Sequence, residues 1–263
     1  MEHIAIDGLG VAVEVVGTGP PLVLLHGILQ DSRAWRPQFD ALADEFTLVA
    51  LDAPGCGRSD DPPETWRFRE YADCLAQLIA SLHLTAPIIG GLSWGGTLAI
   101  EFEHQHPGVA SALILAGAYA GWAGSLSSQV RDERLASCLA QSKMAPEAFV
   151  PDWMPGLFTP DAPPGLIHEY GGLMFDFHPS GFRTMANAVA EADLRPALPS
   201  IELPVLLLHG EDDQRSPAHT VGADLAAQIP QAKLLVIPRA GHLCNAEQPE
   251  AFNAAIREFA ANL

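Results

Sequence analysis

Gly91-Leu92-Ser93-Trp94-Gly95 is the most informative segment of this chain. It follows an apolar run, Ala86 to Ile89, and precedes a helical pattern, Thr97 to Gln105. A Gly-x-Ser-x-Gly turn between a strand and a helix exposes a serine hydroxyl, and its glycines are needed because side chains beside the strained serine would collide. A free hydroxyl is a weak nucleophile, so the turn predicts chemistry only where a base and an acid accompany it.

Short apolar runs alternate with helical patterns along most of the chain, as expected of strands that helices cover on both faces. The predicted strands are Val11–Val16, at the sheet edge, and Pro21–Leu25, Phe46–Leu51, Ala86–Ile89, Ala112–Ala116, Pro204–Leu208 and Leu234–Ile237. The predicted helices are Arg69–Leu82, Thr97–Gln105, Ala218–Gln228 and Pro249–Ala261. This alternation predicts an α/β fold with a mostly parallel sheet flanked by helices.

The alternation breaks between about Tyr119 and Leu194, in a stretch rich in Pro, Gly and aromatic residues. Because it is too long for an ordinary loop, we predict a helical cap insertion over residues 119–194. Residues 1–118 and 195–263 would then form the core of a single domain. The aromatic residues of the insertion predict an apolar substrate pocket, with Trp122, Trp153 and Phe158 as the candidate binding residues.

The charge of the chain limits its partners. With 32 acidic against 14 basic residues, the formal net charge is −18, which argues against nucleic acid or an anionic membrane as a partner. No apolar run reaches the ~18 residues of a transmembrane helix. We therefore expect a small-molecule substrate, no nucleic acid and no membrane, in a monomer or homodimer.

Cofactor motifs are absent from the sequence. No glycine-rich nucleotide loop occurs, and no His/Cys/carboxylate cluster has metal-ligand spacing, so we predict no cofactor and no metal. The cysteines Cys56, Cys74, Cys138 and Cys244 are scattered, and residues 1–8 do not resemble a secretory signal. Reduced thiols in a cytoplasmic protein are the simplest interpretation.

Candidate partners for Ser93 follow other predicted strands, whose carboxyl ends meet at one edge of a parallel sheet. Glu211, Asp212 and Asp213 follow the strand at 205–208, and one of these carboxylates would orient a histidine. His242 follows the strand at 234–237 and would be the base, since imidazole exchanges protons near neutral pH.

Other histidines have simpler interpretations. His104 and His106 lie at a predicted helix end, where capping explains them. His168 and His178 lie in the insertion, where contact with substrate stays open. Only His242 lies in a loop that follows a late strand and precedes a helix, so it is the preferred base.

These motifs together resemble the α/β-hydrolase superfamily along the whole chain. The matching segments are His26-Gly27, Asp52–Ser59, Gly91–Gly95, Gly210–Pro217, and Gly241-His242 with Glu247, Pro249 and Phe252-Asn253 downstream. The resemblance implies an eight-stranded α/β-hydrolase fold and a triad in the order Ser, Asp, His. The family's acid lies three residues after the glycine, which selects Asp213 from Gly210. The backbone N–H groups of Ile28 and Trp94 would form the oxyanion hole.

Within the superfamily the chain most resembles 3-oxoadipate enol-lactonase-like esterases, through Glu191–Pro196 and Trp153–Phe158. This implies a serine hydrolase that cleaves a small or medium carboxylic ester or lactone through an acyl-enzyme. Three alternatives stay open: a carbon–carbon bond hydrolase of ring-fission diketones, a cofactor-free perhydrolase, and a ligand sensor on a hydrolase scaffold. If the substrate carries a carboxylate, an arginine should reach the pocket; the candidates are Arg33, Arg131, Arg134 and Arg183.

Overall fold

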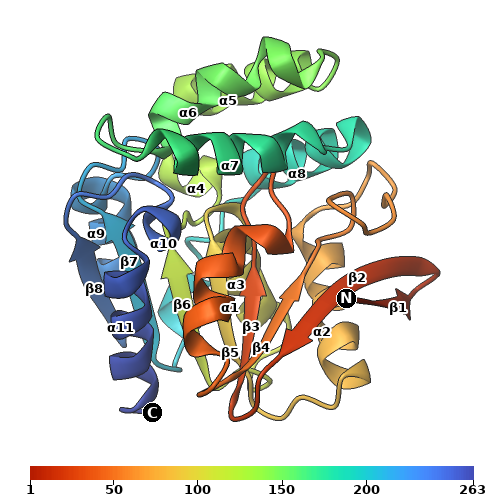
Figure 1. Cartoon of the computed structure of the whole chain (residues 1–263). Coiled ribbons are helices and arrows are strands. Elements are labelled where there is room, and N and C mark those ends of the chain that lie inside the picture. The colour runs from red at the N-terminus through yellow and green to blue at the C-terminus, as the bar shows by residue number, and fades with distance from the viewer.

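An eight-stranded, mostly parallel sheet runs through the centre of the protein, as the sequence predicts (Figure 1). The computed structural model describes every residue, 1–263. The strands are β1 (Glu2–Ile6), β2 (Leu9–Val16), β3 (Pro21–Leu25), β4 (Thr47–Leu51), β5 (Ile88–Leu92), β6 (Ala112–Ala116), β7 (Val205–Gly210) and β8 (Ala232–Ile237). They are adjacent in the order β1-β2-β4-β3-β5-β6-β7-β8, and only the β1–β2 and β2–β4 pairs are antiparallel.

Helices cover both faces of the sheet, which is why β5, β6 and β7 are wholly buried and, apart from His209 in β7, have no polar side chain. In Figure 1, α1 (Arg36–Leu42) and α11 (Pro249–Ala260) pack together in front of the sheet, and α2 (Phe68–Ser81) and α3 (Trp94–Gln105) pack together behind it. The short helices α9 (Ala223–Gln228) and α10 (Cys244–Glu247) flank the C-terminal strands. No helix has both the length and the apolar character that crossing a membrane would require.

The prediction that Val11 to Val16 forms the sheet edge is wrong. This segment belongs to β2, which pairs with β4 on one side and with β1 on the other. Asp7 and Gly8, with φ of 49° and 84°, form the tight turn that folds β1 back onto β2. Sequence analysis missed β1 because the strand is short and mostly exposed, with only Ile6 buried, so it lacks the continuous apolar run of a buried strand.

A layer of five helices lies above the carboxyl ends of the parallel strands (Figure 1). They are α4 (Trp122–Ser125), α5 (Ser128–Gln141), α6 (Val150–Leu157), α7 (Pro164–Phe175) and α8 (Pro179–Glu191). Buried hydrogen bonds join this layer to the rest; among them, the indole Nε1 of Trp94 donates to Met185 O at 3.1 Å, and the Tyr170 hydroxyl donates to Ala34 O at 2.9 Å. The arrangement supports the proposed division into a core and an insertion over residues 119–194.

Helix α8 meets the core through two glycines. A methyl group added to Gly181 would overlap the carbonyl oxygen of Gly55, in the loop that follows β4. Backbone therefore packs directly on backbone here, and only glycine allows this approach.

We expect Gly181→Ala to destabilise the protein by about 1–3 kcal/mol, because the methyl group forces α8 away from the core. Gly172→Ala is the matched control, since this glycine lies in α7 and an added methyl meets no atom within 4 Å. Its replacement should stabilise the protein by about 0.5–1 kcal/mol. Urea unfolding measures both, and equal effects would contradict the packing argument.

Candidate active site

Ser93 occupies the turn between β5, which ends at Leu92, and α3, which begins at Trp94. Its backbone has φ 54° and ψ −111°, a conformation that costs about 1–3 kcal/mol for a residue with a side chain. Hydrogen bonds hold it there: the Ser93 N–H donates to Ala116 O at 2.7 Å, and the Gly96 N–H donates to Ser93 O at 3.0 Å. The end of β6 and the first turn of α3 therefore stabilise the strained conformation of Ser93.

The two glycines of the motif are required by backbone packing. A methyl group on Gly91 would overlap the carbonyl group of Gly95, and one on Gly95 would overlap the carbonyl oxygen of Leu25 at the end of β3. No larger residue fits either position without moving the backbone. The turn therefore brings Ser93 close to the loop that follows β3.

Asp213 and His242 form a buried pair beside this turn. The Nδ1 of His242 and the Oδ2 of Asp213 lie 2.8 Å apart, and the two side chains are 3% and 0% exposed. The other carboxylate oxygen of Asp213 accepts the backbone N–H groups of Arg215 at 2.8 Å and Ser216 at 2.9 Å, and the Ser216 hydroxyl donates to Oδ2 at 2.9 Å. Every acceptor direction of this carboxylate is thus used to hold it in place.

These contacts keep Asp213 ionised. Burial raises the pKa of this carboxyl group, but the neighbouring His242 and the donors of Ser216 outweigh burial and hold its pKa below the usual range. The two rival acids point elsewhere: Asp212 is exposed, and Glu211 is exposed and accepts the Arg239 N–H at 3.1 Å. Of the three carboxylates, the structure brings only Asp213 to His242.

Two residues fix the position of the His242 ring and loop. A methyl group on Gly117, at the end of β6, would lie 3.0 Å from both Cε1 and Nδ1 of His242, so glycine makes room for the ring. The carboxylate of Glu247 accepts the Gly241 N–H at 2.8 Å and the Thr159 N–H at 3.1 Å. It therefore ties the His242 loop to the helical layer above.

Ser93 and His242 line the same cavity, which has about 420 Å³ of empty volume. Ser93 is partly exposed, and its hydroxyl has no hydrogen-bond partner in the protein. The remaining lining residues come from the β3 loop, from α4 to α6 and from the loops after β6, β7 and β8: Gly27, Ile28, Gln30, Tyr119, Trp122, Arg134, Trp153, Leu157, Arg215 and Leu243.

The backbone N–H groups of the two predicted oxyanion donors, Ile28 and Trp94, have no acceptor in the protein. Ile28 lines the cavity, and Trp94 directly follows Ser93. The β3 loop is held in place by Gln30, whose side-chain oxygen accepts the Gly27 N–H at 3.1 Å, and by His26, whose Nε2 accepts the Ala53 N–H at 2.9 Å. Two fixed donors beside a hydroxyl can stabilise negative charge on an oxygen.

The predicted aromatic residues divide into two groups. Trp122 and Trp153 line the cavity, whereas Phe158 does not. Phe158 follows the last residue of α6, and its ring packs edge to face on Tyr170 with the centroids 5.8 Å apart. Its position therefore stabilises the contact between α6 and α7 and does not bring it to substrate.

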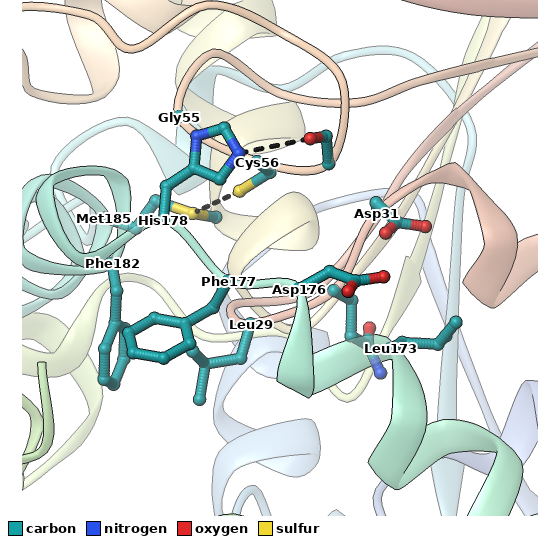
Figure 2. Close-up of a pocket in the computed structure, with 12 residues that line it drawn as sticks. Leu29, Asp31, Gly55, Cys56, Leu173, Asp176, Phe177, His178, Phe182 and Met185 are labelled. Atoms are coloured by element: carbon teal, nitrogen blue, oxygen red, sulfur yellow. Dashed lines mark hydrogen bonds between the residues drawn. The ribbon is translucent and has the colours of Figure 1, made fainter. Parts of the chain in front are cut away.

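A second cavity of about 270 Å³ lies next to the first, because Gln30 lines both. Figure 2 shows the rings of Phe177 and Phe182 side by side near Leu29, with Met185 and His178 on the other side. His178 hydrogen-bonds Asp61 at 2.6 Å, so it is already partnered. Sequence analysis did not identify this apolar cavity, although it did note that the insertion is rich in aromatic residues.

Among the four arginines proposed from the sequence, only Arg134 reaches the Ser93 cavity. Arg33, Arg131 and Arg183 form ion pairs with Asp31, Asp132 and Glu64. Sequence analysis missed Arg215, which lines the cavity two residues after Asp213. No group of three or more His, Cys, Asp or Glu side chains is arranged to hold a metal ion.

The sequence matches the model of the "Alpha/beta hydrolase family" over residues 22–255. The chain belongs to this family. The predicted α/β-hydrolase fold is therefore confirmed, and so is membership of a family of enzymes.

Known relatives cover nearly the whole chain. The AB hydrolase superfamily protein YisY of Bacillus subtilis is 28% identical over 256 residues, which cover 94% of this chain and 94% of that protein. The 3-oxoadipate enol-lactonase 2 of Acinetobacter baylyi is 28% identical over 243 residues, covering 90% and 87%. A thermophilic esterase from Thermogutta terrifontis, with malate bound, superposes with a TM-score of 0.90 at 31% identity, covering 99% of this chain and 96% of that chain. The predicted resemblance to enol-lactonase-like esterases is confirmed.

Gly117→Ala should reduce activity on any substrate by about tenfold or more, because the added methyl displaces the His242 ring. Gly108→Ala is the matched control: its φ of 80° is also positive, but no atom lies within 4 Å of an added methyl. Both variants should lose stability through backbone strain, and only the first should lose turnover in the folded protein. Steady-state kinetics and thermal unfolding separate the two effects, and equal loss of turnover would contradict this role for Gly117.

Proposed function

We propose that this protein is a serine hydrolase that cleaves a small or medium carboxylic ester or lactone through an acyl-enzyme on Ser93. One observation carries the proposal: Ser93 lines the same cavity as His242, and Nδ1 of His242 is hydrogen-bonded to a buried, ionised Asp213. These positions support the proposal, because acyl transfer requires a nucleophile, a base and an acid that orients the base. The esterase and enol-lactonase names of two relatives support the same reaction class.

In the proposed cycle, Nε2 of His242 takes the proton of the Ser93 hydroxyl as its oxygen attacks the carbonyl carbon. The N–H groups of Ile28 and Trp94 bind the oxyanion that forms, and Asp213 stabilises the imidazolium. His242 then protonates the leaving oxygen. Water, activated by the same ring, attacks the acyl-enzyme and releases the acid.

The cavity walls support a small or medium substrate. Trp122, Trp153 and Leu157 supply apolar surface around Ser93, and the cavity of Figure 2 adds more on the side of Gln30. Carbon–carbon bond hydrolysis would use the same three side chains. A panel of a simple ester, a lactone and a vinylogous diketone therefore tests which bond is cleaved fastest.

Ser93→Ala should lower kcat for a short-chain p-nitrophenyl ester by about 10³- to 10⁶-fold, because the covalent route is lost. A fluorophosphonate should label Ser93 in the wild type and leave the variant unlabelled. Ser128→Ala, at the exposed start of α5, serves as the matched control and should keep wild-type turnover. Wild-type turnover in Ser93→Ala would refute the proposal.

Asp213→Asn should lower kcat by about 10⁴-fold, because an amide does not hold the imidazole in the required tautomer. It should also change the pH dependence of stability. The pKa of Asp213 is lowered on folding, so its contribution is complete above its unfolded value of about 3.9 and is lost as pH falls through the folded value. Urea unfolding between pH 6 and pH 3 should therefore show a steeper acid loss in the wild type. Asp212→Asn, the exposed neighbour, should match the wild type in both measurements.

A further inference from the structure

Two half-buried arginines without an acidic partner line the cavity that holds Ser93. They are Arg134, from α5, and Arg215, from the loop after β7. The chain has 32 acidic residues against 14 basic ones, so an arginine without an ion pair is unexpected inside it. Seven other arginines do form ion pairs: Arg33, Arg36, Arg67, Arg131, Arg183, Arg195 and Arg257. The remaining three are exposed to solvent: Arg58, Arg69 and Arg239.

Arg215 is held by an aromatic ring where an acid would be expected. Its guanidinium carbon lies 4.3 Å from the centroid of the Trp153 ring, and its buried Nε has no hydrogen-bond partner. Gly156 makes this position possible, since a methyl there would lie 3.1 Å from Nε. Burial lowers the pKa of Arg215, and the charge of Arg134 adds to that effect, yet an arginine stays protonated in proteins. A stacked guanidinium keeps its in-plane N–H donors free for an anion.

Arg134 is held by neutral groups only. Its two terminal nitrogens donate to the Tyr119 hydroxyl at 3.1 Å and to the backbone oxygen of Arg215 at 3.2 Å. Its guanidinium carbon lies 5.8 Å from the Trp122 ring centroid. These contacts place the guanidinium and leave its charge uncompensated.

The nearby acids do not neutralise this pair. Asp213 already accepts from His242 and Ser216 and forms no ion pair with either arginine. Asp152 is exposed and lines an outer recess together with Arg134 and Arg215, again without forming an ion pair. The positive charge at the Ser93 cavity is therefore free to meet a negative charge from outside the protein.

We propose that Arg134 and Arg215 bind a carboxylate of the substrate, so that the enzyme prefers esters or lactones that carry an acidic group. This inference rests on the proposed function of Ser93. A carboxylate in the cavity would accept from the terminal N–H groups of Arg215, which have no acceptor in the protein, and would offset the repulsion between the two guanidinium groups. A neutral ester leaves both charges half-buried and unpaired, which discriminates against it.

The second cavity indicates in which orientation the substrate binds. Most of its surface is apolar, as the side chains of Figure 2 show, and no arginine or lysine lines it. Its two acids, Asp31 and Asp176, are both ion-paired to Arg33, so this cation is not free to bind a further acid. An acidic group is disfavoured there and favoured beside Arg134 and Arg215. The substrate carboxylate therefore binds on the α5–α6 side of Ser93, away from the Phe177 and Phe182 rings.

The test compares mono-p-nitrophenyl glutarate with its neutral methyl ester. The wild type should show a kcat/KM at least tenfold higher for the anionic ester. Arg134→Gln and Arg215→Gln should each reduce that preference by about 10- to 100-fold, as expected for loss of hydrogen bonds to a charged group. Arg131→Gln, one turn earlier on α5 and ion-paired outside the cavity, is the matched control and should keep the wild-type preference.

A binding measurement separates this inference from the proposed chemistry. Monomethyl glutarate should raise the thermal unfolding temperature of the wild type and of Ser93→Ala, and should have no effect on Arg215→Gln. Arg215→Lys, which keeps the charge and loses the planar fork, should show an intermediate shift. Ser93-dependent hydrolysis with no anionic preference would overturn the arginine proposal alone. Arginine-dependent binding without any hydrolysis would overturn the proposed function and leave the anion site standing.

Discussion

Close backbone packing at the turn after β5 is the constraint on which the rest of the structure depends. Gly95 lies against the carbonyl group of Leu25, so the turn and the end of β3 are joined with no space for a side chain between them. Ser93 is held in a left-handed conformation whose strain the surrounding buried core must offset. Because the core is packed and not easily deformed, the Ser93 backbone is oriented before any substrate arrives.

Close packing at a glycine also occurs at the ends of the neighbouring strands. Gly117 follows β6 and makes room for the His242 ring, and a methyl on Gly210, at the end of β7, would overlap the carbonyl groups of Ala240 and Gly241. Loops that pack through glycines approach more closely than loops that pack through side chains. Three segments far apart in the sequence can therefore present Ser93, Asp213 and His242 at one edge of the sheet.

The sequence was sufficient for the features that local chemistry determines and insufficient for those that only packing determines. Buried parallel strands need continuous apolar runs, and the tight turn needs its glycines, so both can be predicted. The faces of the insertion's helices could not be predicted, because α6 is short and Phe158 lies just beyond its end, where helical spacing no longer indicates direction. Arg215 was missed for a different reason. Whether its side chain has an acidic partner depends on the folded structure, and the residues beside it in the sequence do not indicate this.

The loop after β7 carries two opposite charges, the Asp213 carboxylate and the Arg215 guanidinium, in different surroundings. Asp213 is surrounded by donors, including the backbone N–H of Arg215, while the side chain of Arg215 turns to Trp153 and receives no acceptor. The net charge of −18 repels anions over the whole surface, but at ~0.15 M salt such repulsion is screened beyond about 8 Å. Half-buried charges are screened much less, so near Ser93 the two guanidinium groups outweigh the acidic surface. Their selectivity should therefore persist at ionic strengths that remove the influence of the exposed carboxylates.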